Sequence, residues 1–390
     1  MDGSRLPSMP FRSEAPFPRL LAMGHFVFHG RVGGAEHMFY NLLRGLGEEP
    51  VDLGLLACPG NLDPDFVAEL RRRGPGMLLP CAGGEGSRFV AEQLACFRPG
   101  LRGDAVLFPN YFVPPVVPRR LGRVTTVLHD MQFRHFPANF SAKKRTWLAA
   151  AQGFAMRRAD TVIAISDFVR GDILRHYGAR FARKVVTVPN PISWDRFGPG
   201  GGGRPLEAPY ILSVAAAYAH KNLEVLLHAF AEIAARERDV QLVFCGQDYA
   251  GLRGVSGARR GLAAMAAAMG LGDRVHVTGY VDDRALGRWF RHAAVFAFPS
   301  VFEGFGMPPV EALGFGVPVI TTALTALPEV TLGLAQTVAD PHRAEEWASR
   351  IGEMLRRPEA FRPSAEAVAG LRHHYSPGRI GRLYARACLG

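Results

Sequence analysis

Short apolar, β-branched runs alternate with longer stretches of helical periodicity over the first half of the chain. The runs predicted as strands are Leu20–Phe28, Val51–Cys58, Ala105–Phe108, Val124–His129, Thr161–Ile165 and Val185–Val188. The stretches predicted as helices between them are Gly34–Leu46, Asp63–Arg73, Ser141–Arg158 and Asp167–Tyr177. Strands that alternate with helices are typical of βαβ units, and therefore of a parallel sheet.

A glycine-rich segment interrupts this pattern. Gly200–Gly203 are consecutive glycines, which cannot form the interior of a stable helix or strand. The alternation then restarts, with strands predicted at Tyr210–Val214, Gln241–Cys245, Val275–Thr278, Val295–Phe298 and Val317–Thr321. The helices predicted after the segment are Asn222–Arg236, Asp283–Arg291, Pro308–Leu313 and Arg343–Arg356. We therefore expect an α/β protein with two Rossmann-like, doubly wound domains that face each other across a cleft.

The same pattern predicts the limits of the domains. Residues 1–197 form the expected N-terminal domain, 198–205 the Gly/Pro linker and 206–375 the C-terminal domain. Residues 376–390 are predicted as a C-terminal helix that packs back on the N-terminal domain. Because ligands of doubly wound sheets bind at the carboxyl ends of the strands, we expect the functional site inside the cleft.

Composition narrows the class of protein. Hydrophobic residues make up 48% of the 390 positions and charged residues 21%, which excludes disorder for the bulk of the chain. The five cysteines form no Cys-x-x-Cys pair and are predicted to be reduced thiols of a cytoplasmic protein. The segment up to Arg19 has no apolar core, and the longest uncharged run, Ala312–Pro328, is broken by glycine and proline. We therefore expect neither a signal peptide nor a membrane-spanning helix.

Positive charge is concentrated in the first half of the chain. The formal net charge is +11, and residues 1–200 hold 26 basic and 17 acidic residues, against 20 and 18 in residues 201–390. This asymmetry indicates an acidic partner, either anionic lipid or nucleic acid, although an arginine-rich soluble surface explains it equally well. The predicted helix at 141–158 carries basic residues at Lys143, Lys144, Arg145, Arg157 and Arg158. It is compatible with a membrane surface, but a core-packed helix with solvated ends is favoured.

The loop after the predicted strand Val295–Phe298 carries the strongest chemical signal. Gly304 and Gly306 bracket a phenylalanine, and two prolines then start a helix. The glycines let a ligand approach the backbone closely, and the N-terminus of a helix favours an anion. Glu303 and Glu311 flank the loop, and a carboxylate accepts paired hydrogen bonds from the vicinal hydroxyls of a sugar or ribose. The alternative is a capped helix with two solvated glutamates.

These residues, within Phe-Glu-Gly-Phe-Gly-Met-Pro-Pro-Val-Glu-Ala, resemble the signature of the family-four retaining glycosyltransferases. That family has the GT-B architecture of two Rossmann-like domains. The resemblance runs from about Leu20 to the end of the chain, and the order and spacing of its motifs make it specific. Further motifs lie at Gly33–Glu36, His129–Asp130, Ile165–Phe168, Val188–Pro191, Lys221–Leu223, Gly279–Val281, Pro318–Thr322 and Leu327–Val330. The resemblance implies an acceptor-side N-terminal domain and a C-terminal domain that binds a nucleotide sugar.

The resemblance also implies a role for each residue of the glycine loop. Glu311 would hold the ribose hydroxyls of the nucleotide, and Glu303 would bind hydroxyls of the donor sugar. The backbone N–H groups of Phe305 and Gly306, next to Gly304, would contact that sugar or its phosphate.

Other matching residues would surround the diphosphate. Lys221 would neutralise it, and Gly33 and Gly34 would cover it from the opposite domain. His129 would lie beside the donor sugar. The expected catalytic residues are His129, Glu303 and Lys221.

One position departs from the family pattern. The family usually has a glycine and an arginine at the positions of Ala215 and Ala216, so the usual arginine of the diphosphate clamp is absent. Three alternatives remain open: His220 compensates, an arginine from the other domain compensates, or Lys221 acts alone.

The donor is expected to be GDP-mannose. Tyr218–Asn222 and His129–Pro137 resemble bacterial surface-polysaccharide mannosyltransferases of the family. The residues expected on the base side are Gly246, Asp248, Tyr280 and Val281. Asp248 either accepts hydrogen bonds from guanine or caps a loop.

We therefore expect a retaining glycosyltransferase that moves a hexose from a nucleotide sugar to a growing polysaccharide or lipid-linked glycan. No cofactor and no metal are expected, because no His/Cys cluster has zinc spacing and Asp63 and Asp65 are predicted to start a helix. The alternatives within the enzymes are a GT-B nucleotide-sugar epimerase and a phosphorylase, although a phosphorylase needs a pyridoxal-phosphate lysine and the chain has four lysines. The non-enzyme alternative is a basic nucleic-acid-binding protein, for which no zinc finger or RNA-binding strand pattern is present. The expected location is the cytoplasm, with contact to the inner face of the cell membrane left open.

Overall fold

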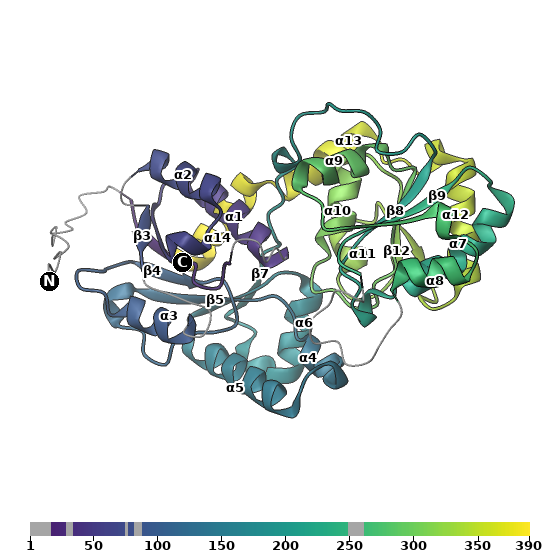
Figure 1. The fold of residues 1–390 in the computed structure, drawn as a ribbon. Coiled ribbons are helices and arrows are strands. Elements are labelled where there is room, and N and C mark those ends of the chain that lie inside the picture. Colours follow the sequence, from purple (N-terminus) through teal and green to yellow (C-terminus); the bar gives the residue numbers. More distant parts are fainter. Residues whose placement is uncertain (1–16, 29–33, 75–76, 82–87, 249–260) are drawn as a thin grey trace, which may run out of the picture.

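Two parallel sheets, each flanked by helices, form the two halves of the molecule (Figure 1). The structure is a computed structural model that describes residues 17–28, 34–74, 77–81, 88–248 and 261–390. The first sheet has seven strands in the order β3-β2-β1-β4-β5-β6-β7, and the second has six in the order β10-β9-β8-β11-β12-β13. The prediction of two Rossmann-like α/β domains is confirmed.

The N-terminal domain contains the first sheet and the helices that cover it. Its strands are β1 (Arg19–Met23), β2 (Asp52–Ala57), β3 (Leu78–Pro80), β4 (Ala105–Phe108), β5 (Arg123–Leu128), β6 (Thr161–Ala164) and β7 (Val185–Thr187). Its helices are α1 (Gly34–Leu46), α2 (Pro64–Arg73), α3 (Arg88–Cys96), α4 (Gln132–His135), α5 (Ala142–Arg158) and α6 (Asp167–Tyr177). Strand β1 ends at Met23 and not at Phe28 as predicted, because the chain turns there and Val27 N donates to Gly24 O.

The C-terminal domain repeats this arrangement. Its strands are β8 (Tyr210–Val214), β9 (Gln241–Cys245), β10 (Val275–Gly279), β11 (Val295–Phe298), β12 (Val319–Thr322) and β13 (Gln336–Val338). Its helices are α7 (Glu224–Arg236), α8 (Leu262–Ala268), α9 (Asp283–His292), α10 (Met307–Gly314), α11 (Leu327–Val330), α12 (Ala344–Arg356) and α13 (Ala365–His374). Strand β12 begins after Pro318 and not at Val317, because proline has no N–H to donate to a ladder.

The chain crosses between the domains twice. It leaves the N-terminal domain through a short 3-10 helix, Asp195–Phe197, and returns just before α14 (Pro377–Leu389). The two crossing segments touch, since Ile192 N donates to Tyr375 O at 2.8 Å. Helix α14 then lies against α1, as Figure 1 shows.

Helix α14 is part of the core of the N-terminal domain. Its side chains Ile380, Tyr384 and Cys388 are fully buried. Two glycines allow the helices to cross closely, because a Cβ on Gly45 of α1 would collide with the carbonyl of Pro377, and one on Gly381 would collide with the backbone of Gly45. The last helix in the sequence thus completes the first domain.

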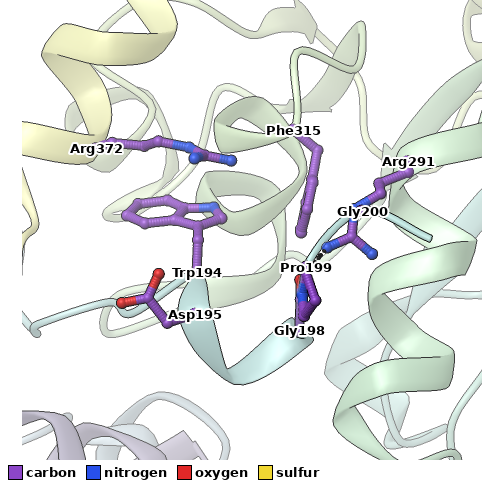
Figure 2. A pocket seen from close by; sticks show the side chains of 8 residues that line it. All are labelled: Trp194, Asp195, Gly198, Pro199, Gly200, Arg291, Phe315 and Arg372. Atoms are coloured by element: carbon purple, nitrogen blue, oxygen red, sulfur yellow. Dashed lines mark hydrogen bonds between the residues drawn. The ribbon is translucent and has the colours of Figure 1, made fainter.

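The start of the linker is fastened to the C-terminal domain (Figure 2). Arg291 Nη2 donates to Gly198 O at 2.6 Å, and Arg372 Nε donates to Gly314 O at 2.8 Å. The guanidinium of Arg372 also lies over the ring of Trp194, 5.4 Å from its centroid. The linker therefore begins as an ordered extension of the C-terminal domain.

Candidate active site

The glycine loop lies at the carboxyl end of β11 and leads into α10. Gly306 caps α10 with a φ of 87°, a left-handed conformation that glycine adopts without strain. Gly304 faces the other domain, and a Cβ there would collide with the carbonyl oxygen of His129. The loop is thus packed directly against the end of β5, and glycine at 304 is what allows the two backbones to meet.

Lys221 and Glu303 form an ion pair beside this loop. Lys221 Nζ lies 2.5 Å from Glu303 Oε1, and their side chains are 18% and 12% exposed. The ammonium also lies 5.6 Å from the ring centroid of Phe298, the last residue of β11. The structure thus brings together the lysine predicted to bind phosphate and the glutamate predicted to bind sugar.

His129 and Asp130 approach from the N-terminal domain. Burial lowers the pKa of His129, so its imidazole is neutral near pH 7. His129 Nε2 lies 2.9 Å from the carbonyl oxygen of Pro109, which can only accept, so Nε2 carries the proton and Nδ1 is an acceptor. Burial raises the pKa of Asp130, while Glu303 raises it further and Lys221 lowers it. A Cβ on Gly304 would lie 3.1 Å from the Cβ of Asp130, so Asp130 lies beside the glycine loop.

Glu311 is buried on α10, with 3% of its surface exposed. Its Oε1 accepts a hydrogen bond of 2.7 Å from Arg196 Nη2. Burial raises the pKa of Glu311, and the Arg196 guanidinium opposes that shift. The same arginine reaches Asp283 through Nη1 at 2.5 Å, and Trp194 Nε1 donates to the backbone carbonyl of Glu311 at 3.1 Å. The first crossing segment therefore holds the predicted ribose-binding residue from two sides.

Arg196 was not among the site residues predicted from the sequence. It is one of 46 basic residues, and it stands 115 positions before Glu311. The sequence feature that could have identified Arg196 is its place between Trp194 and Phe197. A charged residue between two large apolar ones, just before a glycine-rich linker, needs a partner in the protein.

The base-side residues predicted from the sequence lie at the carboxyl ends of β9 and β10. Gly246 N donates to Gly279 O at 2.9 Å, so the two strand ends are joined. A Cβ on Gly246 would collide with the carbonyl oxygen of Ala215, which lies just after the end of β8. Tyr280 is 70% exposed, and Val281 is half-buried. Asp248 Oδ1 accepts a hydrogen bond of 2.9 Å from Leu262 N. This contact corresponds to the capping role considered for Asp248, and not to the binding of guanine.

Tyr280 also lines a cavity of about 1140 Å³ between the domains. The cavity is bounded by α1, α2, the crossing segment and the start of α9, and Arg196 and Asp283 form part of its wall. Its volume slightly exceeds the roughly 300–1,000 Å³ of typical small-molecule sites. The Arg196–Glu311 pair thus connects this cavity with α10.

The glycine pair predicted to cover the diphosphate is only partly described. Gly33 lies outside the described residues. Gly34 begins α1, and a Cβ there would lie 3.7 Å from the sulfur of Met307 at the start of α10. The N-terminus of α1 therefore faces the N-terminus of α10 across the cleft.

His220 does not replace the missing arginine as a cation. Burial and the neighbouring Lys221 lower its pKa to about 3, so the imidazole is neutral. Gln132 of the N-terminal domain donates to its Nδ1 at 2.9 Å. Within the described part of the chain, Lys221 is the cation that pairs with Glu303. The other two alternatives, an arginine from the other domain and Lys221 acting alone, stay predictions.

Further contacts between the domains surround the glycine loop. Ser166 Oγ donates to Gly304 O at 2.7 Å. The carboxylate of Glu329 accepts from Asp167 N and Phe168 N at 2.7 and 3.1 Å, and so caps α6 from the opposite domain. The donor-binding loop is therefore held by both domains.

Among the described residues, no group of three or more His, Cys, Asp and Glu side chains could hold a metal ion. The acidic pair considered in the sequence has a structural role, since Asp63 Oδ1 accepts from Asp65 N and Phe66 N at 2.9 and 3.0 Å and caps α2. None of the helices in the described residues is long and apolar enough to cross a membrane.

Two facing Rossmann-like domains with a candidate ligand site between them define a protein of the GT-B class. The chain belongs to the family-four, group 1 glycosyltransferases, since the family model "Glycosyltransferase Family 4" matches residues 32–196 and "Glycosyl transferases group 1" matches residues 200–367. The resemblance inferred from the motifs is thereby confirmed.

Two curated relatives and one solved structure illustrate the likeness. The chain is 27% identical over 263 residues to O-antigen chain mannosyltransferase B of Escherichia coli, covering 63% of this chain and 64% of that one. It is 32% identical over 213 residues to D-inositol 3-phosphate glycosyltransferase 2 of Catenulispora acidiphila, covering 51% and 49%. The matched parts thus span about half to two thirds of these relatives. Sucrose-phosphate synthase of Thermosynechococcus elongatus has the same fold, with a TM-score of 0.70, 17% identity and coverage of 95% and 98%.

Proposed function

We propose that the protein is a retaining glycosyltransferase that moves a hexose from a nucleotide sugar to a glycan or lipid-linked acceptor. The observation that carries the proposal is the Lys221–Glu303 pair at the glycine loop before α10, faced by His129 from the other domain. This arrangement supplies one positive charge and a helix N-terminus for a leaving phosphate, and a carboxylate for sugar hydroxyls.

In the proposed reaction, the bond from the anomeric carbon to the donor phosphate breaks and a bond to the acceptor oxygen forms on the same face of the sugar. The acceptor proton passes to an oxygen of the departing diphosphate. Lys221 and the N-terminus of α10 stabilise the negative charge that develops there, without requiring a metal or other cofactor. Glu303 leaves its pairing with Lys221 in part to accept hydrogen bonds from the sugar.

His129 acts in this proposal as an acceptor for a donor-sugar hydroxyl. Its Nε2 proton is engaged by Pro109 O, so Nδ1 offers a lone pair and the ring carries no charge. A neutral ring does not repel the positive character that develops on the sugar. The residue therefore orients the donor.

Glu311 is proposed to hold the ribose. Arg196 keeps one carboxylate oxygen engaged and favours the charged form of the acid, which is needed to accept both ribose hydroxyls. The base would then enter the cavity lined by Tyr280 and Asp283.

For the donor, we propose GDP-mannose. Support comes from the likeness to O-antigen chain mannosyltransferase B and from the motifs at Tyr218–Asn222 and His129–Pro137. Because the chain is also similar to a D-inositol 3-phosphate glycosyltransferase, the test of the donor compares GDP-mannose with other nucleotide sugars. We further propose a cytoplasmic enzyme of surface-polysaccharide assembly, such as lipopolysaccharide, that acts at the inner face of the cell membrane and does not bind nucleic acid.

The decisive experiment is to incubate the purified protein with GDP-mannose, UDP-glucose and ADP-glucose and a lipid-linked glycan extract, and to measure nucleotide release. The anomeric configuration of the product, determined by NMR, tests retention. Release from none of the nucleotide sugars would contradict the glycosyltransferase proposal. Thermal shifts with GDP and UDP test the base, because a ligand at 100 times its Kd stabilises by about 2.7 kcal/mol. A larger shift with UDP would overturn the mannose assignment alone.

A further inference from the structure

Large apolar side chains gather on one exposed face of the N-terminal domain. They are Phe89 (38% exposed), Val90 (58%), Leu94 (65%), Phe97 (49%), Val116 (54%) and Trp147 (38%). We call this set the apolar patch. It contains six of the ten large hydrophobic residues that are exposed in the described chain, and the other four are scattered over both domains. A cluster of this kind marks a surface that meets something apolar, whereas single exposed apolar residues do not.

The apolar patch is one continuous surface built from three segments. The ring of Phe89 on α3 lies 5.0 Å from that of Trp147 on α5 and 4.5 Å from that of Phe112 in the loop after β4. The side chain of Gln93 donates to Val116 O at 2.7 Å and accepts from Val116 N at 3.1 Å, which fastens the same loop to α3. Figure 1 shows α3 and α5 next to each other on the lower side of the domain.

The positive charge of the N-terminal half lies in the same segments. Residues 88–158 contain 12 basic and 3 acidic residues, while the rest of residues 1–200 contain 14 of each. One of the three acids, Glu92, is buried and paired with Arg88 at 3.2 Å, and another, Asp130, lies in the cleft. Lys143 and Lys144 are exposed on the first turn of α5, one turn before Trp147. The patch is therefore apolar in the middle and basic around it.

We propose that the apolar patch docks the protein on an anionic lipid bilayer. This inference deepens the proposed function and rests on its lipid-linked acceptor. The aromatic rings would lie at the level of the headgroups, the aliphatic side chains of α3 would enter the acyl boundary, and the lysines would pair with lipid phosphates. A second copy of the chain fits this surface less well, because it would bring two basic rims together. Nucleic acid fits less well because aliphatic side chains such as Val90 and Leu94 offer no hydrogen bonds to bases or phosphates.

The position of the patch also suits an acceptor held in the bilayer. The loop that carries Val116 begins at Pro109, whose carbonyl oxygen is the partner of His129 Nε2. Asn110 O in the same loop accepts from Thr126 Oγ1 of β5 at 2.7 Å. One short loop thus connects the docking surface with the histidine of the candidate active site. Docking would place the cleft next to the membrane surface.

The test is co-sedimentation of the full chain with phosphatidylcholine vesicles, with or without one quarter phosphatidylglycerol. Val90→Ser/Leu94→Ser removes apolar contacts without touching the core, and we expect it to bind anionic vesicles about tenfold more weakly. Lys143→Gln/Lys144→Gln should weaken binding by about fivefold per lysine and reduce its dependence on salt. The matched control is Leu332→Asn, an exposed leucine of the C-terminal domain, 42% exposed, which should bind like the wild type.

Two results would overturn the inference. One is wild-type protein that sediments equally with both vesicle types or with neither. The other is that both double variants, Val90→Ser/Leu94→Ser and Lys143→Gln/Lys144→Gln, bind vesicles like the wild type. This holds also if sedimentation equilibrium shows that these variants dissociate a dimer. Nucleotide-induced thermal shifts are measured on every variant and should be unchanged. A wild type that binds vesicles but releases nucleotide from no sugar would refute the proposed function and leave the docking surface standing.

Discussion

The two domains share one strand order and differ in what they contribute to the cleft. When the strands of each sheet are numbered in chain order from that sheet's first strand, both sheets have the order 3-2-1-4-5-6. The N-terminal sheet has β7 as an additional strand at its edge. The C-terminal domain presents charged side chains that are paired within the protein, such as Lys221–Glu303 and Glu311 with Arg196. The N-terminal domain contributes a neutral histidine at the end of β5 and carries exposed lysines, such as Lys143 and Lys144, on an outer surface.

This difference separates what the topology determines from what the loops determine. The shared strand order places a site at the carboxyl ends of both sheets. The chemistry then depends on a few residues after the strands: a glycine loop and an ion pair after β11 in one domain, and His129 after β5 in the other. Substitutions in the two domains should therefore have different effects on turnover and on stability.

The largest expected effect is that of Lys221→Ala in the C-terminal domain. Removing the ammonium should lower turnover of the nucleotide sugar by about 10²–10³-fold, because a preorganised charge at a developing anion contributes that much. The measurement is nucleotide release with a soluble acceptor. Lys143→Ala, an exposed lysine of the N-terminal domain, serves as the matched control and should retain wild-type turnover. Equal losses in the two variants would remove the functional distinction between the domains.

The next effect is that of Arg196→Gln in the crossing segment. It leaves the buried Glu311 carboxylate without its cation, which should cost about 3–5 kcal/mol of the free energy of unfolding. Arg204→Gln, an exposed linker arginine, should cost almost nothing. The double variant Arg196→Gln/Glu311→Gln should recover part of the loss, because it removes the unpaired charge. Denaturant unfolding of the four proteins measures all three expectations.

The same variant should show a distinct dependence on pH. Burial already raises the pKa of Glu311 above its ordinary 4.5, and removal of Arg196 raises it further. A carboxyl group with a raised folded-state pKa loses stability as pH rises from its unfolded value towards its folded value. The deficit of Arg196→Gln relative to wild type should therefore be larger at pH 8 than at pH 5. A deficit that is constant over this range would show that Glu311 does not respond to Arg196.

A smaller effect is expected where the domains meet. Gly304→Ala would force a Cβ against the carbonyl of His129, and an overpacked site of this kind costs about 1–3 kcal/mol. We expect reduced turnover without global unfolding. Gly200→Ala in the linker, where a Cβ meets nothing within 4 Å, should behave like the wild type in melting and turnover assays.

The smallest expected effect is that of chelation. We expect turnover to be unchanged by EDTA, because Lys221 and the N-terminus of α10 supply the charge that a divalent cation would otherwise supply. The assay is run with and without added magnesium and manganese. Loss of activity in EDTA with recovery on either metal would contradict this expectation and would shift the electrostatic role away from Lys221.

The sequence allowed most of the framework to be predicted, because buried parallel strands are continuous apolar runs. Tyr210–Val214, Gln241–Cys245 and Val295–Phe298 were predicted with the bounds that the structure has. Strands β3 and β13 were missed because each has only three residues, and helix α3 because its exposed face is apolar and so shows no helical alternation. Helices α8 and α13 were missed as well.

The candidate site was predictable only where its residues are close in sequence. Glu303 and Glu311 could be recognised together because eight positions separate them around a glycine loop. The partnership of Arg196 with Glu311 depends on how the domains meet, which no local pattern reports. The same holds for the apolar patch, whose three segments come together only when the first sheet has formed.

The return of α14 to the N-terminal domain also bears on how the chain folds during synthesis. Ile380, Tyr384 and Cys388 fill the core beside α1, so the first domain lacks part of its core until α14 has left the ribosome. The C-terminal domain, whose sheet is complete by β13, can fold before the domain that precedes it. Completion of the first domain therefore waits for the synthesis of α14, and a nascent chain stalled near residue 375 would be a target for chaperones that bind exposed apolar surface.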